Sequence, residues 1–322
     1  MTKRELPVQP AMGQSYYPDD EIDLRELFAI LWRGKWIITV FTVVFAAVGV
    51  LYALSKPNIY QASVLLAPAQ DEGGTGGISG QLGGLASLAG ISLGSGGSNQ
   101  TMIAREVLQS RAFIADFIRS HSLSVPLLAT EAWNDNDQVW IYNADVYNIE
   151  SGQWLTDEKG ESLKPTDWDL VKTFKEDHLN VSENKDTGMI TLSVKSLSPL
   201  AAQQWAEWLV TDINEHMRQQ DVTKANARIE YLEGKLNETN VAGMQQVFYQ
   251  LIESETRTVM LANAQKEYVF ETVDPAVVPQ EKTEPKRALI CIVATALGGI
   301  LGALIVFVRA FILSGKQENE NT

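Results

Sequence analysis

Three histidines and one short acidic cluster are the side chains of this chain most suited to metal or acid–base chemistry. His121, His178 and His216 lie far apart and show no spacing typical of metal ligands. The run NDND at 134–137 is similar to the start of a calcium loop, but it lacks the glycine and the distant glutamate of such loops. We therefore expect no metal site and no cofactor.

The sequence also lacks the motifs of nucleophilic catalysis and of nucleotide binding. The single cysteine, Cys291, lies inside a long apolar run, and no G-x-x-x-x-G-K-[ST] phosphate loop occurs. Nothing points to the paired carboxylates of a glycosidase. Four tryptophans could stack on sugars, although packing in a core or a subunit interface is commoner: Trp133, Trp140, Trp154 and Trp168. These observations predict a protein that is not an enzyme.

Two apolar runs without any charge, at 36–55 and 288–308, dominate the hydropathy pattern. As helices each would be roughly 30 Å long, which matches the hydrocarbon core of a bilayer. Arg25, Arg33 and Lys35 precede the first run and a single lysine follows it, so the positive-inside rule predicts a cytoplasmic N-terminus. Two spans then return the C-terminus to the cytoplasm. The net charge of −14 argues against nucleic-acid binding.

These runs predict five segments. They are a cytoplasmic tail with an interfacial helix (1–35), a first transmembrane helix (36–55), a periplasmic domain (56–287), a second transmembrane helix (288–308) and a cytoplasmic tail (309–322). With no cysteine between the spans, the exported domain has no disulfide. The predicted fold class is α+β, with two transmembrane helices flanking an α/β domain that has a small mixed sheet near the membrane.

Within the exported domain, alternating and helical periodicities predict the individual elements. They are a strand near residue 60, a glycine-rich loop (73–98), a helix (99–121), short strands (131–170), a hairpin (177–196), a very long helix (198–236), a second helix (241–266) and a strand at 267–273. The long helix has a polar middle, which suggests that it packs at its two ends and crosses solvent or a subunit interface between them. Near its C-terminal end, five residues step by three and four and form a coiled-coil-type oligomer seam: Val222, Ala225, Ile229, Leu232 and Leu236.

The segment before the second span combines stiffness with positive charge. Pro279 and Pro285 favour extended backbone, and Lys286 follows at the level of the outer phosphates. Within the span, Gly298 and Gly302 form G-x-x-x-G, which allows two helices to approach closely. We predict that these five residues act in transmembrane packing and regulation.

The order proline, Pro-Lys, eleven residues and G-x-x-x-G resembles the second-span signature of Wzz-type chain-length determinants, the polysaccharide co-polymerases without a kinase domain. The runs EIDLRELFAILWRGKW, YQASVLLAP, AQQWAEWLVTDIN and YVFETVDPAVVP are also similar to that family. Two positions depart from its pattern: Ala276 stands where proline is usual, and Glu284 where serine is usual.

The resemblance implies a non-enzymatic scaffold in the inner membrane of a Gram-negative bacterium. It implies a ring-like homo-oligomer of octamer type that regulates the length of lipopolysaccharide O-antigen. The implied partners are a Wzy-type polymerase and lipid-linked polysaccharide. Two alternatives stay open at this point: a co-polymerase for capsule or exopolysaccharide export with a separate tyrosine kinase, and a two-span sensor.

Overall fold

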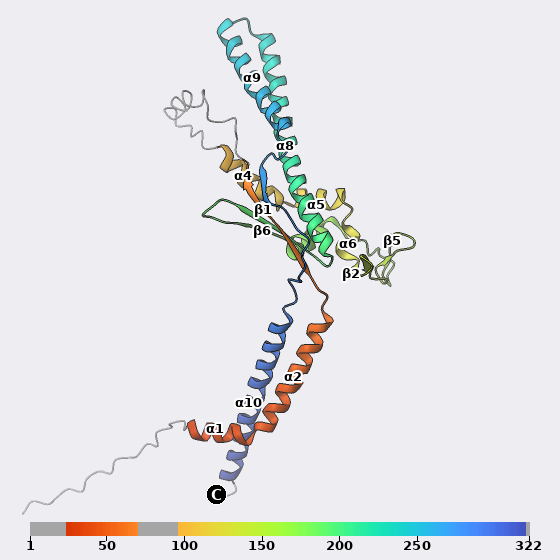
Figure 1. Ribbon diagram of the computed structural model, residues 1–322, viewed down its shortest axis with the longest axis vertical. Coiled ribbons are helices and arrows are strands. Elements are labelled where there is room, and N and C mark those ends of the chain that lie inside the picture. The colour runs from red at the N-terminus through yellow and green to blue at the C-terminus, as the bar shows by residue number, and fades with distance from the viewer. Residues whose placement is uncertain (1–23, 70–95, 320–322) are drawn as a thin grey trace, which may run out of the picture. The chain divides into compact units, whose positions relative to one another are not determined.

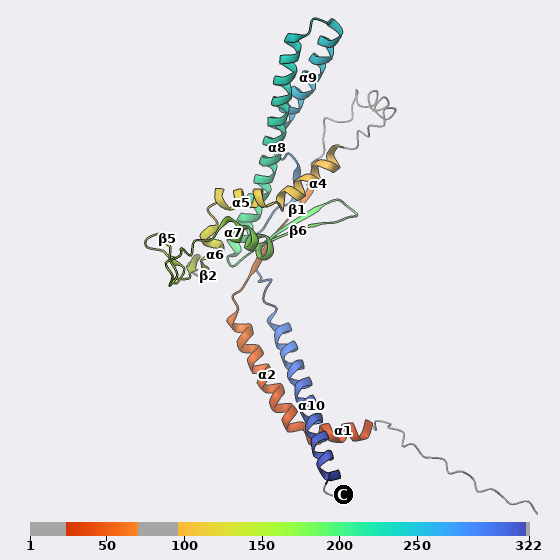
Figure 2. The ribbon, with the colours of Figure 1, turned by 180° about the vertical axis from the view of Figure 1, so that it is seen from behind.

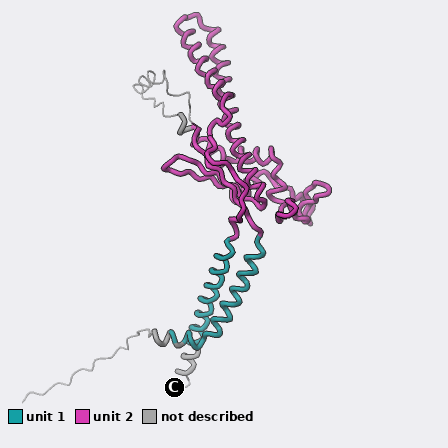
Figure 3. Tube along the Cα trace, viewed as in Figure 1, with its two compact units in different colours: residues 1–56, 286–322 teal, residues 57–285 magenta. Residues whose placement is uncertain are grey.

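The computed structural model describes residues 24–69 and 96–319, and it divides into two compact units (Figure 3). Unit 1 combines residues 1–56 with 286–322, and unit 2 is the continuous segment 57–285. The two candidate membrane runs therefore belong to one unit, although more than 200 residues separate them in the sequence.

Unit 1 is helical where the structure describes it, with α1 (Leu24–Arg33), α2 (Lys35–Ser55) and α10 (Arg287–Asn319) (Figure 1). Helix α10 continues into the segment expected to be a tail (309–322), because no proline or glycine interrupts the chain between Gly302 and residue 315. The expected N-terminal tail and residues 73–95 of the expected glycine-rich loop lie outside the described residues, and residues 96–98 of that loop belong to a helix.

The sheet of unit 2 has four strands in the order β6-β7-β1-β8. They are β1 (Tyr60–Pro68), β6 (Leu179–Glu183), β7 (Ile190–Ser196) and β8 (Phe270–Asp274). All three pairings are antiparallel, so the expectation of a mixed sheet is wrong. The reason is that β6 and β7 form a tight hairpin closed at Gly188 (φ 69°), while β8 returns along the other edge of β1.

Helix α8 (Pro199–Glu238) is the longest element of unit 2, at about 60 Å. Ser198 caps it by accepting a hydrogen bond from the Ala201 N–H, and proline occupies the first turn. Its first half packs on the sheet and buries Trp205, Leu209 and Ile213 in the main core. Helix α9 (Ala242–Ala264) folds back along its second half (Figure 2).

The polar middle of α8 was expected to cross solvent or a subunit interface, but part of it packs within the chain. Asn214 and Met217 are both buried there. The Asn214 Oδ1 accepts hydrogen bonds from the backbone N–H groups of Tyr268, Val269 and Phe270, and its Nδ2 donates to the Phe270 carbonyl. The side-chain amide of Asn214 thus supplies hydrogen-bond partners to the backbone groups at the start of β8. This explains why a polar residue occupies a core position.

The helix expected at 99–121 is two helices, α4 (Gly96–Leu108) and α5 (Arg111–Ser120). Ser110 separates them because its hydroxyl accepts a hydrogen bond from the Phe113 N–H and starts a new helix. Helix α6 (Ser124–Leu128) and α7 (Asp167–Thr173), continued by the π-helical turn η1 (Phe174–His178), complete the helices beside the sheet.

Two short hairpins carry the tryptophan-rich region: β2 (Thr130–Asn134) with β3 (Val139–Tyr142), and β4 (Tyr147–Asn148) with β5 (Gln153–Trp154). Trp133 meets Trp140 edge-on at 5.0 Å between ring centroids, and Trp140 stacks on Trp205 at 6.4 Å. Trp154 meets Tyr147 at 5.5 Å. The three hairpin tryptophans are partly buried against other aromatic rings, whereas Trp168 lies on α7, is exposed and has the Arg111 guanidinium over its ring at 4.9 Å.

Candidate functional site: the packed apolar helices

Helices α2 and α10 are long and apolar enough to cross a membrane by length and composition. The most apolar 18-residue segments within Lys35–Ser55 and Arg287–Ala310 have mean hydropathies of 2.5 and 2.6. Most of their large apolar side chains are exposed, among them Val48, Leu51 and Ile300. An apolar surface of this kind is stable in hydrocarbon and unfavourable in water. A single stripe on each helix is covered, and this stripe is the contact between them.

Gly298 and Gly302, the two predicted glycines, lie on this contact. A Cβ atom added to Gly298 would come within 2.7 Å of the Phe45 Cβ and 3.0 Å of the Phe41 carbonyl oxygen. At Gly302 it would come within 2.8 Å of the Ile38 Cα. The G-x-x-x-G motif therefore admits the backbone of α2 from the same chain.

Four further positions extend the contact, and the sequence interpretation missed them. A Cβ on Gly34 would lie 2.3 Å from the Val306 Cγ1, and one on Gly49 would lie 2.5 Å from the Ala294 Cβ. On α10 the contact residues thus recur at every fourth position, 294, 298, 302 and 306. This spacing is a ridge typical of helix packing, and reading it beyond the two glycines would have revealed the complete stripe.

The helix ends near the unit boundary are joined by a polar contact. The Arg287 Nε donates to the Ala53 carbonyl oxygen at 3.1 Å. Ala53 lies in the last turn of α2, where backbone carbonyls have no partner in their own helix. A guanidinium there satisfies a carbonyl and complements the negative end of the helix dipole.

The proline segment is tied to the start of β1. The Ile59 N–H donates to the Glu284 carbonyl at 2.9 Å, and the Thr283 N–H donates to the Ile59 carbonyl at 2.8 Å. The Glu284 side chain also forms an ion pair with Lys195 of β7. Pro279 and Pro285 lie outside helices and strands on either side of these bonds, and the chain bends between them at residues 280 and 281. The Lys286 carbonyl accepts the first helical bond of α10, from Ile290.

The five seam residues lie on the half of α8 that packs against α9 of the same chain. Ala225 is almost fully buried, as is Ala262 on α9, and the other four seam residues are half-buried: Val222, Ile229, Leu232 and Leu236. Beside them, the Arg228 Nη1 and the Glu255 carboxylate form an ion pair at 3.2 Å. The 3-4 spacing thus forms an intramolecular hairpin, and the predicted contact with a second copy stays a prediction.

Each histidine contacts aromatic rings, and His216 meets Phe113 edge-on at 5.6 Å between ring centroids. His121 stacks on Trp208 at 4.2 Å and its Nε2 lies 2.9 Å from Asp212. Burial lowers the pKa of His178, whose Nδ1 contacts the Lys195 carbonyl oxygen at 2.7 Å. Among the described residues, no group of three histidine, cysteine, aspartate or glutamate side chains could hold a metal ion.

Two family models match the chain, one at each end. The model described as "Chain length determinant protein" (Wzz) matches residues 20–121, and the model described as "G-rich domain on putative tyrosine kinase" (GNVR) matches residues 236–311. Between them the matches include α2 and the apolar part of α10. Residues 122–235 lie between the two matched ranges. A search of curated protein sequences gives no match.

Similar solved structures include a "full-length bacterial polysaccharide co-polymerase", 15% identical, which covers 91% of this chain and 99% of that one with a TM-score of 0.38. A "Fragment of WzzB, Polysaccharide Co-polymerase from Salmonella Typhimurium" is 12% identical and covers 70% of this chain and 100% of that one with a TM-score of 0.29. Because these TM-scores are low, the family membership of the chain rests on the two matches to sequence-family models.

Proposed function

The chain belongs to the Wzz family of chain length determinant proteins, and from this premise we propose that it regulates the length of lipopolysaccharide O-antigen. In this proposal α2 and α10 span the inner membrane of a Gram-negative bacterium. Unit 2 lies in the periplasm and both termini are cytoplasmic. The protein is a non-enzymatic scaffold that assembles with itself in a ring of octamer type.

The observation that carries the proposal is the pairing of α2 with α10. The Wzz match includes the first helix, the second match includes the apolar part of the other, and a stripe of small residues joins them within one chain. Such a pair would hold unit 2 at both of its ends. A Wzy-type polymerase and its lipid-linked polysaccharide are the partners for which a membrane-held scaffold is suited.

Deletion of the gene tests this function directly. We expect the strain to make polymer whose bands on a gel no longer cluster at one length, and we expect the wild-type chain to restore the cluster. A strain that makes no polymer, or one whose length distribution is unchanged, would contradict the proposal. A reporter fused near Trp154 should be periplasmic, and a cytosolic reporter would contradict the orientation.

A second candidate function follows from the match at residues 236–311. The description of that model names a tyrosine kinase, which favours a co-polymerase for capsule or exopolysaccharide export. In that case a separate tyrosine kinase should copurify with the full-length chain in detergent. Loss of surface capsule in the deletion strain, with an unchanged O-antigen ladder, would decide for this alternative.

A further inference from the structure

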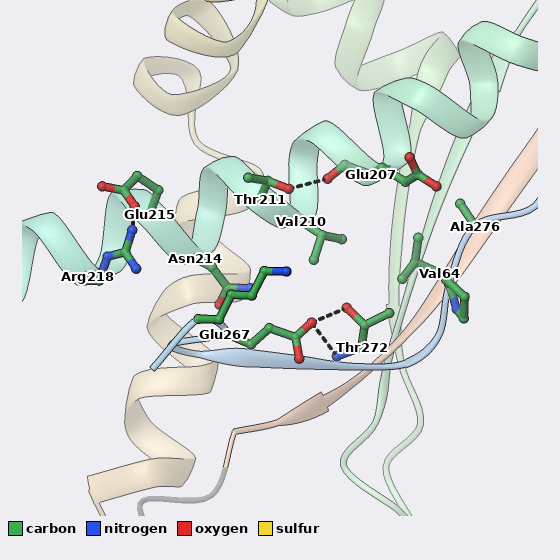
Figure 4. Close-up of a pocket in the computed structure, with 12 residues that line it drawn as sticks. Val64, Glu207, Val210, Thr211, Asn214, Glu215, Arg218, Glu267, Thr272 and Ala276 are labelled. Atoms are coloured by element: carbon green, nitrogen blue, oxygen red, sulfur yellow. Dashed lines mark hydrogen bonds and ion pairs between the residues drawn. The ribbon is translucent and has the colours of Figure 1, made fainter. Parts of the chain in front are cut away.

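An open groove lies between α8 and the segment that contains β8 (Figure 4). It has a volume of about 500 Å³ and belongs entirely to unit 2. Along α8 it is lined from Glu207 to Arg218, a distance of about 16 Å at the helical rise. The opposite wall carries Glu267 and Thr272.

The floor of the groove is apolar. Val64 of β1, Val210 of α8 and Ala276 line it, although each is less than 10% exposed, and Pro275 adjoins them. A floor of this kind suits the C–H faces of a ligand that is polar at its edges. A simple ion would not require an apolar floor.

The rim is polar, and part of it is already engaged within the protein. Glu215 forms an ion pair with Arg218, and the Glu267 Oε1 accepts hydrogen bonds from the Thr272 N–H and hydroxyl at 3.2 and 2.7 Å. These contacts hold the side chains in place. They also leave other atoms of the rim for a ligand.

Two groups of opposite charge remain for such a ligand. Lys266 forms no ion pair with any described residue, and the Glu207 Oε2 accepts no hydrogen bond from the described part of the chain. The ammonium can donate and the carboxylate can accept. Three carboxylates against two cations make the rim unsuitable for a phosphate or another compact anion.

We propose that this groove binds a segment of the polysaccharide chain whose length the protein regulates. The inference rests on the proposed function and names the surface that contacts the polymer. Sugar hydroxyls both donate and accept hydrogen bonds, as Glu207 and Lys266 require, and sugar C–H faces match the floor. The groove is open and elongated, which suits a linear chain.

The test uses full-length protein in detergent and polysaccharide released from the lipid of the producing strain, with binding measured by titration calorimetry. Because a hydrogen bond to a charged group contributes about 1.5–3 kcal/mol, Lys266→Ala and Glu207→Gln should each weaken binding about tenfold or more. Thr211→Trp, at an exposed position in the groove, should abolish it. Lys235→Ala and Glu230→Gln, on α8 outside the groove, are matched controls and should bind as wild type does.

The groove assignment fails if the wild-type chain does not bind the polysaccharide, or if the three groove variants bind as tightly as the controls. Failure of the proposed function is a different result, namely an unchanged length distribution in the deletion strain. All substituted groups are at least partly exposed, and thermal melts should show that the variants fold. Groove variants that bind weakly should also shift the modal length when they replace the wild-type gene.

Discussion

The chain contains two pairs of packed helices, α2 with α10 and α8 with α9, and the side chains at the two contacts differ in kind. Between α2 and α10 the contact consists mostly of small residues, and the outward surfaces are apolar. Between α8 and α9 the buried centre is Ala225 with Ala262, and an ion pair of Arg228 with Glu255 flanks it. The outward surface is mixed, because charged and polar side chains alternate there with exposed apolar ones such as Leu251 and Met260. Similar backbone arrangements are thus adapted to two surroundings, hydrocarbon and water.

The difference predicts where an added side chain does most harm. Backbone atoms of α2 stand about 3 Å from the Cβ positions of Gly298 and Gly302, and a backbone cannot move aside as a side chain can. In the α8–α9 pair, charged and long side chains surround the contact and can adjust. The predictions below follow from this contrast, beginning with the largest effect.

Replacement of Gly298 by leucine should separate α2 from α10 and abolish the clustering of polymer length. Overpacking of a tight contact costs about 1–3 kcal/mol or more, and here the obstacle includes the Phe41 carbonyl. Gly302→Leu should act in the same way. Gly299→Leu is the matched control, because a Cβ there would meet only the Thr42 Oγ1, at 3.7 Å. Polysaccharide gels from complemented deletion strains give the measurement, and equal ladders for Gly298→Leu and Gly299→Leu would refute the packing role.

Replacement of Ala225 by glutamate should open the α8–α9 hairpin. A carboxylate placed at this buried position without a partner costs at least about 3 kcal/mol. The exposed neighbour supplies the control, Ala227→Glu. Thermal melts and native mass in detergent, taken together, distinguish two roles of the seam. A lower melting temperature with an unchanged mass supports the intramolecular contact. Loss of the oligomer with an unchanged melting temperature would instead show that the seam lies at the interface between subunits.

Asn214→Ala should lower the free energy of unfolding of the full-length chain by about 2–3 kcal/mol, because three backbone N–H groups lose their acceptor. The cost falls on the segment between α9 and β8, so hydrogen exchange of residues 268–270 should accelerate most. Asn226→Ala, at an exposed position of α8, should change neither quantity. An unchanged exchange rate at 268–270 in the Asn214 variant would contradict the assigned role.

The smallest effect concerns pH, which should act on unit 2. Burial lowers the pKa of His178 in the folded chain. Below about pH 6.5 the imidazole therefore binds a proton more readily in the unfolded chain than in the folded chain. The free energy of unfolding should therefore fall as the pH drops below about 6.5 and be constant in this respect above it. Replacement by glutamine should remove that part of the slope in melts at pH 7.5, 6.5 and 5.5. A variant with the same slope as wild type would exclude His178 as the cause.

The sequence pattern was sufficient to predict the structure where the conformation of a segment depends on its own residues. The two uncharged runs, the start of the long helix near residue 198 and the hairpin at 177–196 agree with expectation. The expectation failed at Ser110, where a cap hydrogen bond outweighs continuous helical periodicity. It also failed for Asn214, whose backbone partners lie 54 to 56 residues further along the chain.

The sequence by itself determined the two apolar helices, the long helix and the motifs that resemble a chain-length determinant, because periodicity and composition act within a segment. Only the tertiary structure decided what each contact face meets. It placed Gly298 and Gly302 against α2, and it packed the half of α8 that carries the seam against α9. It also brought α8 and the β8 segment together as the walls of one groove. The physical reason is that a helical stripe specifies the shape and polarity of its partner, whereas the partner's identity depends on the path of the whole chain.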